Sequence, residues 1–187
     1  MSGVLNGIVG LLAIGYPFLV YLSKDQVQPR YVAFFLAAVL LVRGACDKRS
    51  FVVGHWALLA AACVMFMLAA GLVNEPAMLL AYPVFVSLLF FAVFSYSLAH
   101  PPTVVERLAR LQDPDLPPQG VAYTGQVTRV WCGFFLANAS VSLATVWYGD
   151  PWLWSLYNGL VAYLLMAALM AGEMLVRRRI RKTFGPE

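Results

Sequence analysis

Long apolar runs alternate along the chain with short polar and charged clusters. A helix needs about 20 mostly apolar residues to cross a bilayer core about 30 Å thick. Six runs approach that length, and they lie near residues 3–22, 29–46, 51–73, 77–99, 130–149 and 152–176. No alternation of apolar and polar residues recurs over the length of a strand, so a transmembrane barrel is not expected. The pattern predicts a single all-α domain, a polytopic membrane helix bundle with six transmembrane helices.

The composition agrees with a lipid environment. Of the 187 residues, 61% are hydrophobic and 12% are charged, whereas soluble domains have about 45–50% apolar and about 25% charged residues. This balance excludes a cytosolic enzyme, a secreted disulfide scaffold and a disordered tail. The net charge of +4 would suggest a nucleic-acid partner in a soluble protein. Here the positions of the basic residues matter more than their sum, and no nucleic-acid partner is expected.

The distribution of Lys and Arg predicts the orientation, because cytoplasmic segments carry an excess of both. With both termini in the cytoplasm, eleven of the 13 basic residues fall on the inner side, and only Lys24 and Arg30 fall outside. The inner set includes a basic tail over residues 177–187. Aromatic residues bracket the outer turn at residues 149–151, where an interfacial belt is expected. They are Trp147, Tyr148, Trp152, Trp154 and Tyr157.

The one long connection is the cytoplasmic loop over residues 100–129. Thr103 followed by Glu106 forms a capping box between prolines, which predicts a short helix over residues 103–112. Its apolar residues fall largely on one side, so we expect a short amphipathic cytoplasmic helix lying on the inner leaflet. Glu106 and Arg110 are spaced i, i+4, and we expect them to pair on the wet face of this helix.

Two interpretations of the loop remain open. In the first, Glu106, Arg107, Arg110 and Arg129 contact a protein partner, or hold an anionic head group or a carrier-bound acyl chain at the membrane face. In the second, the loop is a structural elbow whose arginines contact anionic lipid, because surface arginines on inner loops follow from topology alone. Membrane lipids, anionic at the cytoplasmic face, are expected partners in both.

Polar residues inside apolar runs are costly in lipid and are therefore candidate functional groups. Arg43 and Glu173 lie near the cytoplasmic ends of the second and sixth runs. They are interpreted either as a gate or head-group site, or as a structural ion pair. Asn138 and Asn158 lie in the fifth and sixth runs, and we expect them to hydrogen-bond across helices. Hydroxyls in these runs are expected to bond carbonyls of their own helix.

The histidines and cysteines complete the candidate chemistry. His55 lies near the start of the third run, and His100 ends the fourth. Neither has a second histidine or a carboxylate three or four residues further on, so no metal site and no cofactor is predicted. Interfacial placement is favoured for both over a proton relay. The three cysteines stand singly in apolar stretches, which is typical of small buried hydrophobes.

The first run is rich in glycine and has the weakest helical pattern. Gly3 and Gly7 form a GxxxG motif. Ordinary packing of small residues within the bundle is the favoured interpretation, and a homodimer through this run is the alternative.

Several short motifs from residue 82 onward carry a family resemblance. They are Tyr82-Pro83-Val84, the stretch from Pro102 to Arg110, Leu116-Pro117-Pro118, Val130-Trp131 with Phe134-Phe135 and Asn138, and Tyr157-Asn158-Gly159. In these motifs the chain resembles a family of uncharacterised bacterial inner-membrane proteins associated with genes for aryl-polyene and related fatty-acid-like pigments. The six-span layout is more distantly similar to the intracellular septation protein A family. These resemblances imply a bacterial inner membrane and a role in the cell envelope, with no catalytic residues to carry over.

Three functions follow as expectations. The first is a non-enzymatic accessory or scaffold protein in envelope-lipid or polyene-lipid assembly. The second is a small carrier or flippase for an amphipathic lipid product, with Arg43, Glu173, Asn138 and Asn158 lining its path. The third is a membrane enzyme that modifies acyl chains or head groups with His100, Glu106 and the nearby arginines.

Overall fold

The computed structural model describes residues 15, 17–18, 20–22, 28–46 and 54–184 of the chain. Every regular element in this part of the chain is helical, which confirms the expected all-α class. In order, the helices are α2 (Pro29–Cys46), α3 (Gly54–Val73), α4 (Pro76–Leu80), α5 (Tyr82–Ala99), α6 (Val104–Arg110), α7 (Pro118–Tyr148), α8 (Pro151–Leu156), the π-helix η2 (Tyr157–Val161) and α9 (Ala162–Phe184). Most of the first predicted run, including its GxxxG motif, lies outside the described residues.

Three helical stretches within the described residues are long and apolar enough to cross a membrane. They cover Tyr82–Ala99, Pro118–Tyr148 and Pro151–Arg177, and a shorter apolar helix covers Ala61–Val73. The bounds of α2 coincide with the predicted run at residues 29–46, and α3 covers most of the run at 51–73. The total of six spans stays a prediction.

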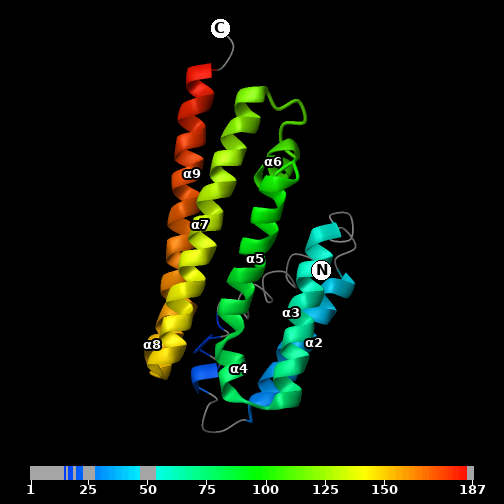
Figure 1. Cartoon of the computed structure of the whole chain (residues 1–187), viewed down its shortest axis with the longest axis vertical. Helices are drawn as coiled ribbons and strands as arrows, with labels where there is room; N and C mark the ends of the chain where they lie inside the picture. The colour runs from blue at the N-terminus through cyan, green and yellow to red at the C-terminus, as the bar shows by residue number, and fades with distance from the viewer. Residues whose placement is uncertain (1–14, 16, 19, 23–27, 47–53, 185–187) are drawn as a thin grey trace.

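The long helices lie side by side along the length of the molecule (Figure 1). α7 lies between α5 and α9, and the α2–α3 hairpin lies on the other side of α5. α4 and α8 lie at one end of the molecule, whereas α6 and the C-terminal end of α9 lie toward the opposite end. The rings of Phe90 on α5 and Phe135 on α7 stack with centroids 5.2 Å apart, within a cluster that also holds Phe94 and Trp131.

The predicted run at residues 77–99 is two helices rather than one. α4 ends at Leu80 and α5 begins at Tyr82, with Ala81 in a turn between them. Pro83 has no N–H for the carbonyl four residues earlier, which weakens a continuous helix at this point. The indole Nε1 of Trp154 donates a hydrogen bond of 3.0 Å to the carbonyl of Leu80, and so joins the break to α8.

The expected loop over residues 100–129 is much shorter than predicted. α7 begins at Pro118 and includes residues 118–129, so only a few residues on either side of α6 are not helical. Proline is well suited to the first position of a helix, because its missing N–H has no partner there in any case. α7 has 31 residues and is therefore about 46 Å long at 1.5 Å per residue.

The turn between α7 and α8 forms where the sequence predicts it. Gly149 has a φ of 80°, and Asp150 caps α8 by accepting a hydrogen bond of 2.8 Å from the N–H of Trp152. Trp147, Tyr148 and Trp152 are exposed, as expected for an aromatic belt. Trp154 and Tyr157 were assigned to the belt wrongly. Trp154 is 1% exposed, and Tyr157 turns its hydroxyl inward to hydrogen-bond α7.

Candidate functional site

Two polar clusters contain most of the candidate residues, one around α6 and one inside the bundle. In the α6 cluster, two side chains hydrogen-bond the backbone at the start of α6. Thr103 Oγ1 accepts a hydrogen bond of 3.2 Å from the N–H of Glu106, which confirms the predicted cap. Ser97 Oγ on α5 accepts a further bond of 3.1 Å from the N–H of Val104. These side chains satisfy backbone donors that a helix start otherwise leaves unpaired, and they fix the angle between α5 and α6.

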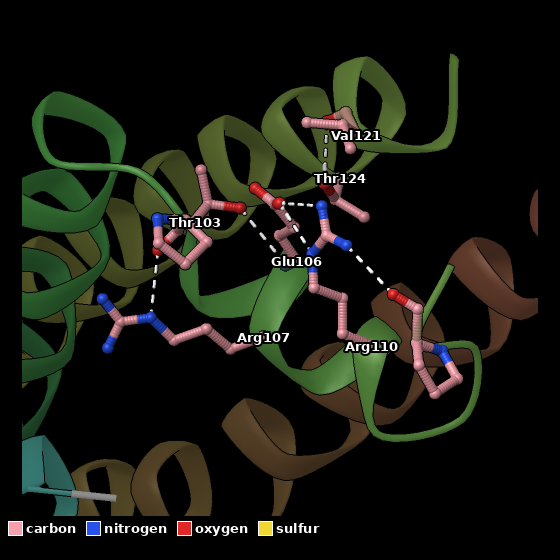
Figure 2. A network of polar contacts seen from close by, with 8 residues as sticks. Thr103, Glu106, Arg107, Arg110, Val121 and Thr124 are labelled. Carbon is pink, nitrogen blue, oxygen red and sulfur yellow. Dashed lines mark hydrogen bonds and ion pairs between the residues drawn. The ribbon is translucent and has the colours of Figure 1, made fainter. Parts of the chain in front are cut away.

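Glu106 and Arg110 form the predicted ion pair (Figure 2). Arg110 donates from Nη2 and Nε to the Oε1 atom of Glu106, at 2.8 and 3.0 Å. Its Nη1 donates to the carbonyl of Pro114 at 3.1 Å. One guanidinium therefore holds both the carboxylate of its own helix and the turn that follows the helix.

The predicted wet face for this pair is wrong. The side chain of Glu106 is 7% exposed and that of Arg110 is 40% exposed. Figure 2 shows the pair beside Thr124, so it lies against α7. Of the apolar side chains expected on the leaflet, Leu108 and Leu111 are 48% and 79% exposed, which is compatible with contact with lipid, whereas Val105 is half-buried and Val104 is buried. Packing against α7 buries Glu106 and Val104, whereas Leu108 and Leu111 face away from the protein.

The other two loop arginines do not join the pair. Arg107 Nε donates to the carbonyl of Pro102 at 3.0 Å, and its guanidinium points away from that of Arg110 in Figure 2. Arg129 is exposed on α7 and makes no hydrogen bond or ion pair with the described residues. Glu106, Arg107, Arg110 and Arg129 therefore do not converge on one anion.

Asn138 and Asn158 bond across helices, as predicted. Asn138 on α7 donates from Nδ2 to Ser87 Oγ on α5 at 3.0 Å, and its Oδ1 accepts from the hydroxyl of Tyr157 at the same distance. Asn158 Oδ1 accepts a bond of 2.7 Å from Ser142 Oγ on α7. Both amides are nearly buried, at 8% and 5% exposure. These bonds join α5, α7 and η2.

The sequence did not single out three of these polar partners. Tyr157 was assigned to the belt, and Ser87 and Ser142 are among the hydroxyls that were expected to bond carbonyls of their own helix. Ser87 does donate to the carbonyl of Pro83 in its own helix, at 2.8 Å, but it also accepts from Asn138. A signal was present in the spacing, since Asn138 and Ser142 are four residues apart on α7 and so share a helix face.

The proposed pairing of Arg43 with Glu173 is not tested, because the side chain of Arg43 lies outside the described residues. Glu173 is half-buried, and its backbone carbonyl accepts a bond of 3.5 Å from the hydroxyl of Tyr123 on α7. This contact holds α9 to α7 near the end of the molecule that carries α6. Tyr123 was not among the residues that the sequence singled out.

The histidines are not joined to the acidic candidate. The side chain of His55 lies outside the described residues. His100 is exposed, its ring stacks on Tyr96 with centroids 4.2 Å apart, and its Nδ1 lies 3.2 Å from the carbonyl of Tyr96. No hydrogen bond links His100 to Glu106 in this part of the chain, where Glu106 is already paired with Arg110.

Among the described residues no three His, Cys, Asp or Glu side chains group closely enough to hold a metal ion. Comparison of the chain with protein-family models, curated proteins and solved structures gives no match.

Proposed function

We propose that this chain is a six-span bacterial inner-membrane protein with both termini in the cytoplasm, acting as a non-enzymatic accessory or scaffold in envelope-lipid or polyene-lipid assembly. Its working surface is the inner block, defined as α6, the turn at residues 111–117, the first part of α7 at 118–127 and the end of α9 at 170–184. This block holds a cytoplasmic or peripheral protein at the membrane. The assignment to envelope-lipid assembly rests on the sequence resemblance alone.

The arrangement of the helices supports this orientation. α6 and the C-terminal end of α9 lie toward the same end of the molecule (Figure 1), as required if the arginine-containing loop and the basic tail share one compartment. The exposed aromatics Trp147, Tyr148 and Trp152 lie at the other end of α7, and such residues favour the membrane interface.

Helix length supports the division between membrane and inner block. A bilayer core about 30 Å thick takes about 20 residues of helix, and counting back from Tyr148 brings the inner boundary to Arg129. About 11 of the 31 residues of α7 then extend past the core. Thr124 lies in this extension, and the Glu106–Arg110 pair of α6 lies beside it (Figure 2), so the charged groups of the pair remain near water.

The observation that carries the proposal is the locked, exposed surface of α6. Thr103, Ser97 and the Glu106–Arg110 pair fix the helix against its neighbours. Leu108 and Leu111 nevertheless remain exposed on it. A rigid helix that presents apolar side chains loses little conformational entropy on binding, as a docking surface requires.

Site-specific photo-crosslinking in intact cells tests the proposal. A photoreactive residue at position 108 or 111 is expected to give one protein adduct of the same mass, and the same residue at Gln126, exposed elsewhere on the inner block, is expected to give none. The double substitution Leu108→Ser with Leu111→Ser should lower the amount of envelope lipid or polyene lipid that the cells assemble, whereas Gln126→Ala should not. Adducts with lipid alone at both leucines would refute a scaffold. If Asn138→Ala abolishes formation of the envelope or polyene lipid while the double leucine substitution leaves it unchanged, the carrier is favoured instead.

A further inference from the structure

Positive charge in the inner block is concentrated at the end of α9. Residues 177–182 hold five basic side chains and no acidic one. They are Arg177, Arg178, Arg179, Arg181 and Lys182. Residues 100–117, which include α6, hold two basic side chains, Arg107 and Arg110, and three acidic ones, Glu106, Asp113 and Asp115, a net charge of −1. The two parts of the block therefore differ in sign.

The arginines of α6 are also occupied. Arg110 gives Nε and Nη2 to Glu106 and Nη1 to the carbonyl of Pro114. Arg107 gives Nε to the carbonyl of Pro102. An anion at this helix would compete with the bonds of Arg110 and would meet Asp113 and Asp115 nearby in the chain. The region in which the sequence predicts a head-group site is a poor anion site once its contacts are known.

The end of α9 is at a suitable height for lipid head groups. α8, η2 and α9 follow one another without a break, so the backbone is helical from Pro151 to Phe184. At 1.5 Å per residue, Arg177 lies about 40 Å along the helix from Pro151, roughly 10 Å beyond a 30 Å core. The Debye length is about 8 Å at physiological ionic strength. Head groups extend the bilayer to about 40–45 Å, or about 5–8 Å beyond the core on each side, so the start of the basic stretch lies within one Debye length of the head-group charge.

α9 is held in place just before this stretch. The hydroxyl of Tyr123 on α7 bonds the carbonyl of Glu173, one helical turn before Arg177. Met166 and Leu169 pack against the aromatic cluster of α5 and α7. The helix therefore emerges from the bundle at a fixed place.

We infer that the end of α9, at residues 177–182, is the binding surface of this protein for anionic phospholipid head groups, and that α6 is not. The inference rests on the proposed orientation. Clusters of four to eight basic residues directly cytoplasmic to a membrane helix attract anionic lipid. The α6 surface is then left for a protein partner.

The test uses the intact purified protein in neutral detergent micelles, titrated with phosphatidylglycerol or with phosphatidylcholine and read by native mass spectrometry of bound lipid. Each basic residue near the surface contributes about fivefold, so the triple substitution R178Q, R179Q and R181Q is expected to weaken phosphatidylglycerol binding by about 100-fold. Binding of phosphatidylcholine should not change. Arg107→Gln, the matched control on α6, should alter phosphatidylglycerol binding less than twofold.

Two outcomes would overturn the inference. One is a triple variant that binds phosphatidylglycerol as the wild type does, and the other is an equal loss on Arg107→Gln. Folding of each variant is checked by the retained binding of phosphatidylcholine. Because binding in micelles does not depend on orientation, reporter fusions at positions 110 and 181 test the topology separately. The lipid surface and the proposed function can therefore fail independently.

Discussion

The ion pair under α6 predicts an unequal response to the loss of its two members. Glu106→Gln removes the carboxylate but keeps the shape of the side chain, and Arg110→Met removes the guanidinium but keeps much of its length. Only Arg110 is substantially open to water, with 40% of its side chain exposed against 7% for Glu106. Loss of the arginine leaves a buried, unpaired carboxylate, whereas loss of the carboxylate leaves an arginine that water can reach.

The magnitudes follow from this difference in burial. Breaking a buried pair by removing one partner costs about 3–5 kcal/mol, and partial exposure of Arg110 allows water to enter and reduces the figure to about 2–3 kcal/mol. Glu106→Gln should cost about 1 kcal/mol, because Arg110 keeps its bond to the Pro114 carbonyl. The double variant should cost less than the sum, with a coupling of about 1–2 kcal/mol.

Hydrogen exchange of the backbone amides at residues 104–113 is the suitable assay, because it reports local opening of α6 without unfolding of the bundle. Exchange rates of the wild type, the two single variants and the double variant give the free energy of local opening of α6 in each. Arg107→Gln is the matched control, since Arg107 lies on the same helix and its Nε bonds the carbonyl of Pro102 and not the carboxylate of Glu106. It should cost less than 1 kcal/mol.

Equal protection in Glu106→Gln and Arg110→Met would refute the reasoning, because it would mean that both charges are equally hydrated. Additive effects in the double variant would show that the two side chains do not interact. Either result would remove the basis for a locked α6.

Three further substitutions test other parts of the fold. Thr103→Ala removes the cap of α6 and should speed local exchange by an amount equivalent to about 1 kcal/mol, with Thr103→Ser close to wild type. Asn138→Ala removes two bonds between helices and should lower the unfolding free energy in mixed micelles by about 1 kcal/mol, whereas Ser140→Ala, which loses only a bond within its helix, should not. Gly149→Ala, at a φ of 80°, should destabilise by about 1–2 kcal/mol, whereas Gly133→Ala, in a helix with open space, should stabilise by up to about 1 kcal/mol. Effects of the same sign at the two glycines would contradict the assigned turn.

Local signals in the sequence predicted much of the fold. Hydrophobic runs gave the ends of α2 correctly and most of α3. The Thr103 cap and the i, i+4 spacing of Glu106 and Arg110 were correct because both contacts lie within one or two helical turns. Interactions of this range depend little on the rest of the chain.

The failures involve contacts between helices. The burial of Glu106 depends on packing against α7, so the amphipathic pattern of α6 placed this one residue on the wet side wrongly. Pro117 and Pro118 fall within the loop predicted over residues 100–129, although a proline also starts a helix well, and here Pro118 starts α7. Trp154 is aromatic and close to the turn at residues 149–151, yet its indole donates a hydrogen bond to the carbonyl of Leu80, 74 residues earlier in the chain. Spacing in one sequence does not contain that information.

The π-helix at Tyr157–Val161 determines which side of α9 faces α7. Its wider turn takes up one more residue than an α-turn, and one residue corresponds to about 100° of rotation. Deletion of a single residue there would turn a different side of α9 toward α7 and separate Glu173 from Tyr123, although the deletion lies more than ten residues away. The direction in which the C-terminal end of α9 faces is therefore decided near the opposite end of the bundle.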